Sequence, residues 1–444
     1  MDTQNIAVIG SGIAGLSAAW LLSRRHRVTI FERESHLGGH SNTRTVMLGD
    51  GPVAVDTGFI VYNEATYPNL TALFEHLDVP NIESDMSFSF SLDEGVYEYN
   101  GTGIQGLFGQ RSNVVNFGHW RMLRDIRRFF AESPEAVLNH EAEVSLGEFL
   151  ERENYSEEFL HRHILPMAGA IWSSPANAMS TFPARSFIEF YANHGLLKIR
   201  NRPKWRTVKG GSQEYVGRLL RSGNMVARTD CEIASVVRHP GYVEIRDANG
   251  NASRFDQVVF ACHADVALRL MGDSDRIEQS LLKPFAYSSN PTVLHTDARH
   301  MPQRRRLWAS WNYLAGSVSA DGQNRSSCTY WMNRLQQPDT ATDLFVTLNA
   351  ASEIAPESIL YETTYRHPIL DTGAIAAQKH LWNLQGHRRS WFCGSYFGFG
   401  FHEDALQSGL AVAEQLGGVS RPWNVPEPSS RITVGPAIML EAAE

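Results

Sequence analysis

The chain has 444 residues, of which 43% are hydrophobic and 20% charged, so it can bury a sizeable core and is not disordered by composition. Its net charge of −8 argues against a dedicated nucleic-acid binder. No apolar run approaches the ~20 residues that cross a bilayer, and we expect no signal peptide. The four cysteines form no C-x-x-C pair and the histidines no H-E-x-x-H motif, so we expect no metal site and a cytoplasmic location.

A glycine-rich turn near the N-terminus joins a predicted strand to a predicted helix. Residues 6–9 have the pattern of a buried strand, residues 16–22 that of a helix and residues 28–31 that of the next strand. Between the first strand and the helix lies G-x-G-x-x-G, which lets a pyrophosphate approach backbone N–H groups at a helix N-terminus. A carboxylate after the second strand can accept hydrogen bonds from a ribose diol. The predicted dinucleotide site comprises Gly10, Gly12, Ile13, Ala14, Gly15, Glu32 and Arg33.

The stretch from Glu32 to Gly39 resembles the E-R-x-x-x-x-G-G-R element of the flavin-containing amine oxidase, phytoene desaturase and protoporphyrinogen oxidase superfamily, with His40 in place of the final arginine. Other elements of that superfamily follow in order. They are Asp56-Thr57-Gly58-Phe59, Lys209-Gly210-Gly211-Ser212, Asp256-Gln257-Val258-Val259-Phe260-Ala261 and a closing motif from Phe392 to Gly409, in which Ser395 stands where the superfamily often has Asp or Glu.

This resemblance implies non-covalent FAD, because no Cys-Tyr pair resembles a covalent flavin attachment. It also implies an α/β fold: a Rossmann-type FAD-binding domain, similar to those of glutathione reductase and the amine oxidases, with an inserted α+β substrate domain. The further cofactor-binding residues that it implies are Gly38, Gly39, His40, Ser41, Gly58, Phe59, Ile60, Ile233, Ala261, Gly394, Ser395, Phe401, His402 and Ala405.

The flavin motifs lie in three separated segments, so we expect a discontinuous FAD-binding domain. Its predicted segments are 1–80, 203–285 and 385–425. The substrate domain would comprise residues 81–202, mainly helical with helices near 122–130 and 146–150, and residues 286–384, which contain strands near 291–295 and 345–348. Residues 426–444 are expected to form an irregular extension.

The substrate is predicted to be apolar. Many members of the superfamily keep a lysine in the second substrate segment, whereas no lysine occurs here between Lys283 and Lys379. The stretches Thr329–Gln336, Tyr365-Arg366-His367-Pro368 and Gly400-Phe401-His402-Glu403-Asp404 carry a finer resemblance. They resemble bacterial FAD-dependent oxidoreductases that accompany cyclopropane-fatty-acid-synthase-like methyltransferases. That resemblance implies hydride transfer to flavin N5 from a methyl-branched acyl chain of a phospholipid, giving an alkene. An amine or amino-acid oxidase and a non-catalytic flavoprotein remain alternatives, and oxygen, a quinone or an electron carrier could reoxidise the flavin.

Several single residues are candidates for the substrate site. His402 and Tyr62 are candidate catalytic residues, with turn capping and core packing as their structural alternatives. The aromatic residues expected to line the substrate tunnel are Trp172, Trp311, Tyr330 and Trp331, for which core packing is again the alternative.

The segment between Ile104 and Phe130 alternates arginines with aromatic and aliphatic residues. Such a stretch can dock on an anionic membrane, which would make the protein peripheral to the inner face of the membrane. The alternative is a helix that packs on its own domain and exposes its arginines to solvent.

Overall fold

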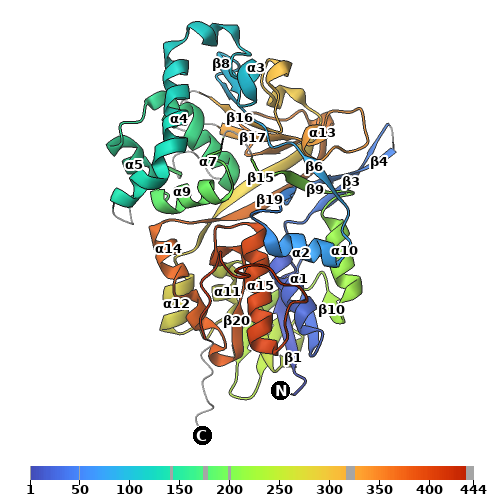
Figure 1. Cartoon of the computed structure of the whole chain (residues 1–444). Coiled ribbons are helices and arrows are strands. Elements are labelled where there is room, and N and C mark those ends of the chain that lie inside the picture. Colours follow the sequence, from blue (N-terminus) through green and yellow to red (C-terminus); the bar gives the residue numbers. More distant parts are fainter. Residues whose placement is uncertain are drawn as a thin grey trace.

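The computed structural model describes residues 2–49, 51–140, 144–173, 179–198, 202–316 and 326–436. Figure 1 shows two layered parts, one above the other. The lower part, which holds both termini, is built on a five-stranded parallel sheet, and the upper part is built on a seven-stranded sheet with helices beside it. The predicted α/β fold is therefore confirmed.

The parallel sheet has the strand order β10-β2-β1-β14-β20, and every neighbouring pair is parallel. Parallel sheets are covered on both faces, which agrees with the burial of residues 6–9 in the central strand. The segments 1–80, 203–285 and 385–425 each supply strands, although the exact domain boundaries stay a prediction. The strands are β1 (Asn5–Ile9), β2 (Arg27–Phe31), β10 (Met225–Arg228), β14 (Gln257–Phe260) and β20 (Ser390–Phe392).

The helices of this lower part pack around the sheet (Figure 1). Helix α1 is buried along its whole length, and α15 packs tightly against it. A Cβ on Gly409 of α15 would lie 2.3 Å from the Ala14 carbonyl oxygen, and one on Gly417 would lie 2.6 Å from Leu22, so the two helices run in the same direction. Their N-termini therefore lie at the same end. The helices are α1 (Ile13–Leu22), α2 (Pro68–His76), α10 (Gln213–Ser222), α11 (Ala264–Leu270), α12 (Arg276–Leu282), α14 (Thr372–Gln378) and α15 (His402–Gly417).

Three small sheets lie outside the parallel sheet. One is the hairpin β3-β4 and another is the antiparallel meander β11-β12-β13. In the remaining sheet, β9 lies between β5 and β6 and pairs antiparallel with both. Their strands are β3 (Thr43–Leu48) with β4 (Gly51–Asp56), β5 (Val61–Asn63) and β6 (Asn81–Ser84) with β9 (Trp205–Val208), and β11 (Ile233–Arg238), β12 (Val243–Asp247) and β13 (Ala252–Phe255).

The seven-stranded sheet has the order β19-β15-β18-β17-β16-β7-β8 and joins the two predicted insertions. Strand β7 of the first insertion pairs in parallel with β16 of the second, with Phe88 opposite Trp311. The strands are β7 (Phe88–Leu92), β8 (Tyr97–Asn100), β15 (Ala286–His295), β16 (Trp311–Ala315), β17 (Ser326–Trp331), β18 (Phe345–Leu348) and β19 (Ile359–Ile369), with α13 (Met332–Leu335) after β17.

The first insertion therefore differs from the mainly helical segment that we expected at its start, where β6, β7 and β8 precede the helices. The alternating Phe-Ser-Phe-Ser-Leu of residues 88–92 suits a strand rather than a helix. The helices are α3 (Gly103–Leu107), α4 (Phe117–Ala136), α5 (Leu146–Arg152), α6 (Glu157–Phe159), α7 (Leu165–Trp172) and α9 (Ala184–Asn193).

The C-terminal extension is irregular over residues 426–436, and residues 437–444 lie outside the described part of the chain. The extension packs on the lower part, because the Pro428 carbonyl accepts a hydrogen bond from Asn69 Nδ2 at 3.0 Å. None of the helices in the described ranges is both long and apolar enough to span a bilayer.

Arg238 of β11 forms a buried ion pair with Glu278 of α12 and a second one with Asp273 at 2.9 Å. Removing one partner of a buried pair leaves the other charge uncompensated. We expect Arg238→Met to lower the free energy of unfolding by about 3–5 kcal/mol in urea denaturation. The control is Arg254→Met on β13, whose side chain is 68% exposed and which should cost about 0–1 kcal/mol. Equal effects of the two variants would contradict this interpretation.

Candidate functional site

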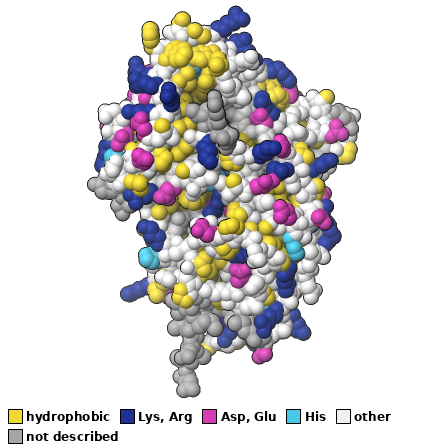
Figure 2. All heavy atoms as spheres, viewed as in Figure 1, with side chains coloured by type: hydrophobic (Ala, Val, Ile, Leu, Met, Phe, Trp, Pro, Cys, Tyr) yellow, Lys and Arg dark blue, Asp and Glu magenta, His cyan; other side chains and the backbone are white. Residues whose placement is uncertain are grey.

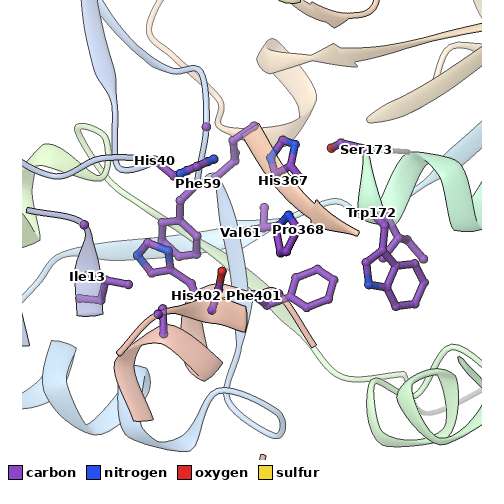
Figure 3. Close-up of a pocket in the computed structure, with 18 of the residues that line it drawn as sticks. Ile13, His40, Phe59, Val61, Trp172, Ser173, His367, Pro368, Phe401 and His402 are labelled. Carbon is purple, nitrogen blue, oxygen red and sulfur yellow. The ribbon is translucent and has the colours of Figure 1, made fainter. Parts of the chain in front are cut away.

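A large cavity lies where the N-termini of α1 and α15 meet β19 and the helices of the first insertion. It encloses about 1630 Å³ of space free of protein atoms, part of it open to solvent. Figure 3 shows Ile13 and His402 on one side of this cavity and Trp172 on the other. The two sides differ chemically, because glycines and histidines line the first and apolar side chains the second.

The three glycines of the N-terminal turn are required for different reasons. Gly10 has φ +103°, and a Cβ on Gly15 would lie 2.0 Å from the Gly10 carbonyl oxygen, so the fold itself needs both. Gly12 has an ordinary φ of −62°, and no protein atom lies within 4 Å of the position that its Cβ would take. Because Gly12 lines the cavity at the uncapped N-terminus of α1, the space above it fits a pyrophosphate bound by backbone N–H groups.

The second glycine pair lies directly against this turn. The Gly38 N–H donates to the Ser11 carbonyl at 3.1 Å, and a Cβ on Gly39 would lie 3.0 Å from the Gly12 Cα. Both glycines have positive φ, at 122° and 59°. The two glycine segments thus form one backbone cradle, although Gly38 and Gly39 themselves do not line the cavity.

Glu32 follows β2 beside the same turn. One of its carboxylate oxygens accepts hydrogen bonds from the Ser11 N–H at 3.0 Å and the Ser11 hydroxyl at 2.6 Å, and the other accepts one from the Glu34 N–H at 3.0 Å. The carboxylate therefore holds the turn in place. The second oxygen keeps acceptor capacity for the ribose diol that the sequence predicts.

The side chain of His402, the first residue of α15, is held by Phe59 and Tyr215. Its ring stacks on Phe59 with centroids 3.8 Å apart, and its Nε2 lies 2.7 Å from the Tyr215 hydroxyl, which also bonds Ser41. Burial lowers the pKa of His402 to about 3, so the imidazole is neutral near pH 7. A neutral, firmly oriented ring can position a substrate or cofactor, whereas a pKa this low makes it a weak base. Its catalytic role stays a prediction.

Four further histidines line the cavity: His40, His263 and His367 on the side of His402, and His194 beside Phe190 on the other side. His40 stacks on Tyr365 at 4.9 Å, and its buried Nε2 has no hydrogen-bond partner in the described part of the chain. Burial lowers the pKa of His40 to about 4 and those of His263 and His367 to about 3, so these three imidazoles are polar but uncharged at neutral pH. The unpartnered Nε2 suits a cofactor oxygen at the position where the superfamily has arginine.

The closing motif supplies the loop between β20 and α15. Gly394 and Ser395 line the cavity, and the Gly394 N–H donates to the Ser408 hydroxyl at 2.9 Å. The acidic residues that follow serve the fold instead. Glu403 accepts hydrogen bonds from the backbone N–H groups of Asn69 and Leu70 at the start of α2, at 3.0 and 2.9 Å.

The far side of the cavity is aromatic and apolar. Trp172 of α7 packs on Phe190 at 4.5 Å and on Phe401 at 5.9 Å, and thereby joins the first insertion to the closing loop. Trp311 and Tyr330 lie opposite each other on β16 and β17, with ring centroids 4.8 Å apart. The other apolar residues of this side are Ile60, Val61, Met86, Ile171, Leu196 and Trp205.

Two predicted site residues, the candidate catalytic Tyr62 and the candidate substrate-binding Trp331, lie outside the cavity wall, and for the same reason. On β5 the cavity is lined by Val61, so Tyr62 points to the other face, where it packs on Phe74 at 5.1 Å. On β17 the cavity is lined by Tyr330, so Trp331 points away and donates its Nε1–H to Asp343 at 3.0 Å. Successive side chains of a strand face opposite sides, which corrects both expectations.

The remaining predicted residues divide into those that line the cavity and those around it. Ile233 is buried in β11 and Arg33 is exposed in an ion pair with Glu34, both outside the cavity wall. Gly10, Gly15 and Ser41 lie behind the wall. The predicted residues that line the cavity are Gly12, Ile13, Ala14, His40, Gly58, Phe59, Ile60, Trp172, Ala261, Trp311, Tyr330, Gly394, Ser395, Phe401, His402 and Ala405.

Four further residues of the site were not predicted from the sequence: Tyr215, His263, Arg366 and His367. Tyr215 follows the middle glycine pair by four residues, and Arg366 and His367 belong to a stretch that marks the finer resemblance. Arg366 lines the cavity while its guanidinium pairs with Asp265 at 2.6 Å. Their places next to or within motifs already identified in the sequence could have pointed to Tyr215, Arg366 and His367 as site residues.

The family described as flavin containing amine oxidoreductase matches residues 13–355. The carotenoid phi-ring synthase of Streptomyces griseus is 42% identical over 79 residues, which span 17% of this chain and 15% of that protein.

Among solved structures, a proposed protoporphyrinogen oxidase from Exiguobacterium sp. 255-15 aligns with a TM-score of 0.67 at 14% identity, covering 94% of this chain and 99% of that one. A fatty acid isomerase from P. acnes, which produces CLA, aligns with a TM-score of 0.60 at 17% identity, covering 91% and 97%. These two likenesses show the fold. From the family match and the fold, the chain belongs to the flavin-containing amine oxidoreductase family and is an FAD-dependent oxidoreductase.

Proposed function

We propose that this oxidoreductase dehydrogenates an apolar acyl chain, and that a methyl-branched chain of a phospholipid is its substrate. The substrate would lose a hydride to FAD and a proton from the adjacent carbon, and the proton would pass to solvent through the open part of the cavity, so that one C=C bond replaces two C–H bonds. An electron acceptor such as oxygen, a quinone or a carrier protein would then reoxidise the cofactor.

The observation that carries this proposal is the composition of the cavity wall opposite the glycine cradle. Trp172, Phe190, Trp311 and their apolar neighbours offer an acyl chain a dry surface, and burying a chain there is favourable by about 0.8 kcal/mol per CH₂. Among the described residues that line the cavity, none is Asp, Glu or Lys. A cationic amine would therefore lack a carboxylate partner in this part of the wall, which favours the acyl substrate over an amine.

The names of two compared proteins agree with an apolar substrate, since one refers to a carotenoid and the other to a fatty acid. Three side chains of the cavity wall would contribute to the proposed reaction. The stacked ring of His402 and the aromatic wall of Trp172 and Phe401 would orient the chain and exclude water from the reacting bond.

A matched pair of variants tests the acyl substrate. Leu196 and Leu197 are neighbouring, half-buried residues, but Leu196 lines the cavity and Leu197 does not. We expect Leu196→Gln to lower kcat/KM for methyl-branched phospholipid about 10- to 100-fold, because an acyl contact of this size contributes roughly 1.5–3 kcal/mol, while Leu197→Gln has little effect. The measurement is mass spectrometry of the released fatty acids, which should lose two hydrogen atoms. Amines oxidised with peroxide release, and lipids left unchanged, would refute the proposal.

A further inference from the structure

The end of the molecule opposite the two termini exposes apolar side chains on an ordered surface. Fractional exposure reaches 87% for Phe117, 79% for Val115, 77% for Ile104, 54% for Val114 and 51% for Trp120. All five belong to α3, η1 (Arg111–Val115) or the first turn of α4, and we call them together the α3–α4 surface. Figure 2 shows hydrophobic side chains gathered at the top of the molecule, where Figure 1 places α3, with Lys and Arg side chains near them.

The backbone beneath the α3–α4 surface is held by specific contacts. Trp120 donates its Nε1–H to the Val114 carbonyl at 2.9 Å and packs on Phe108 at 5.0 Å. The Asn116 side chain caps α4 by accepting from the His119 N–H at 3.1 Å. These contacts fix a conformation in which large apolar groups face solvent, and a contiguous exposed patch of this kind marks a binding surface.

The charges on the same surface are basic. Arg111, Arg121, Arg124 and Arg127 are exposed, whereas Asp125 among them is buried and accepts a hydrogen bond from the Ser156 N–H at 3.0 Å. Arg121 pairs with Glu158 at 3.5 Å and Arg124 with Asp125 at 3.4 Å, whereas Arg111 and Arg127 have no ion-pair partner in the described parts of the chain. This positive patch stands out on a protein whose net charge is −8.

We propose that the α3–α4 surface docks on the surface of an anionic phospholipid bilayer. Phe117, Val115 and Trp120 would enter the boundary between headgroups and acyl chains, while the arginines bind lipid phosphates. Charge favours this partner over a second copy of the chain, because a two-fold contact would bring the same arginines face to face. The proposal does not depend on the substrate of the cavity.

Vesicle flotation with the full-length, FAD-loaded protein tests this docking. We expect binding to phosphatidylcholine vesicles that contain phosphatidylglycerol to be at least about tenfold stronger than binding to phosphatidylcholine alone, and to weaken as salt rises. The double variant V115S/F117S should lose about tenfold or more in binding. Its control is Val226→Ser on β10, because Val226 is also exposed, at 60%, but lies on the lower sheet. A visible flavin spectrum identical to that of the wild type shows that each variant is folded.

A charge variant separates the electrostatic contribution. R111Q/R127Q should weaken binding to the anionic vesicles and flatten its salt dependence, while Arg221→Gln on α10 should change neither. Equal binding to neutral and anionic vesicles, or unchanged binding of V115S/F117S, would overturn the proposal. So would a dimer in light scattering that V115S/F117S converts to a monomer, because the surface would then bind a second copy of the chain.

Discussion

Gly12→Ala should leave the apoprotein folded and lower its affinity for FAD about 10- to 100-fold. The φ of −62° suits alanine, and no protein atom lies within 4 Å of the added Cβ, so the stability of the apoprotein should not change. The methyl group would instead occupy the space above the N-terminus of α1, where it separates the pyrophosphate from backbone donors. Each charge-assisted hydrogen bond lost there is worth about 1.5–3 kcal/mol.

Two other glycines serve as controls for this prediction. Gly241→Ala also meets no atom within 4 Å but lies in the turn between β11 and β12, so both stability and FAD affinity should be unchanged. Gly15→Ala places a Cβ 2.0 Å from the Gly10 carbonyl oxygen and should destabilise the apoprotein itself. Flavin fluorescence titration gives the affinities and circular dichroism the melting temperatures. Unaltered FAD binding by Gly12→Ala would place the cofactor elsewhere.

Lowering the pH from 7 to 5.5 should remove several kcal/mol from the free energy of unfolding of the apoprotein. Burial lowers the pKa of eight histidines to about 3 or 4, whereas the unfolded chain binds these protons near pH 6.5. Each therefore costs about 1 kcal/mol of stability over this interval. The histidines are His40, His119, His163, His194, His263, His295, His367 and His402.

Three carboxyl groups oppose this effect without cancelling it. Burial raises the pKa values of Asp56 and Asp404 to about 6 and also raises that of Glu403, so the folded chain keeps protons that the unfolded chain has released, and the stability that they contribute rises as the pH falls. Eight histidines outweigh them. The free energy of unfolding of the apoprotein should therefore fall as the pH is lowered from 7 to 5.5.

Urea denaturation at several pH values measures this loss, and two neighbouring histidines supply the control. His163 is buried and its Nδ1 lies 2.8 Å from the Tyr99 hydroxyl, while the side chain of His161 is 64% exposed. Below pH 6.5, the slope of the free energy of unfolding against pH reports how many protons the chain takes up on unfolding. His163→Gln should lower that number by about one, and His161→Gln should leave it unchanged. A free energy of unfolding that is level between pH 7 and 5.5 would contradict the burial of neutral histidines.

Local patterns in the sequence predicted the nucleotide-binding half of the molecule well. The turn from Gly10 to Gly15 needs a strand before it and a helix after it, and both follow from runs of apolar residues within the same 30-residue unit. The closing motif, known from the resemblance, likewise gave site residues that line the cavity, among them Gly394, Phe401 and His402.

The substrate half was harder to predict, because its details depend on strand register and on partners distant in sequence. Choosing Tyr62 over Val61 and Trp331 over Tyr330 required knowledge of which face of β5 and β17 meets the cavity, and aromatic character gives no information about that face. The contact between Tyr215 and His402 joins residues 187 positions apart. No local sequence pattern predicts such a contact, because it forms only when α10 and α15 pack near each other.

The measurement that tests the central claim most directly is the visible spectrum of the FAD-loaded protein, mixed without oxygen with methyl-branched phospholipid. If the apolar wall presents an acyl chain to the cofactor, the lipid should bleach the flavin absorbance band while amines leave it unchanged. A flavin band that the lipid does not alter and an amine bleaches would contradict the account, and would assign the cavity to amine oxidation instead.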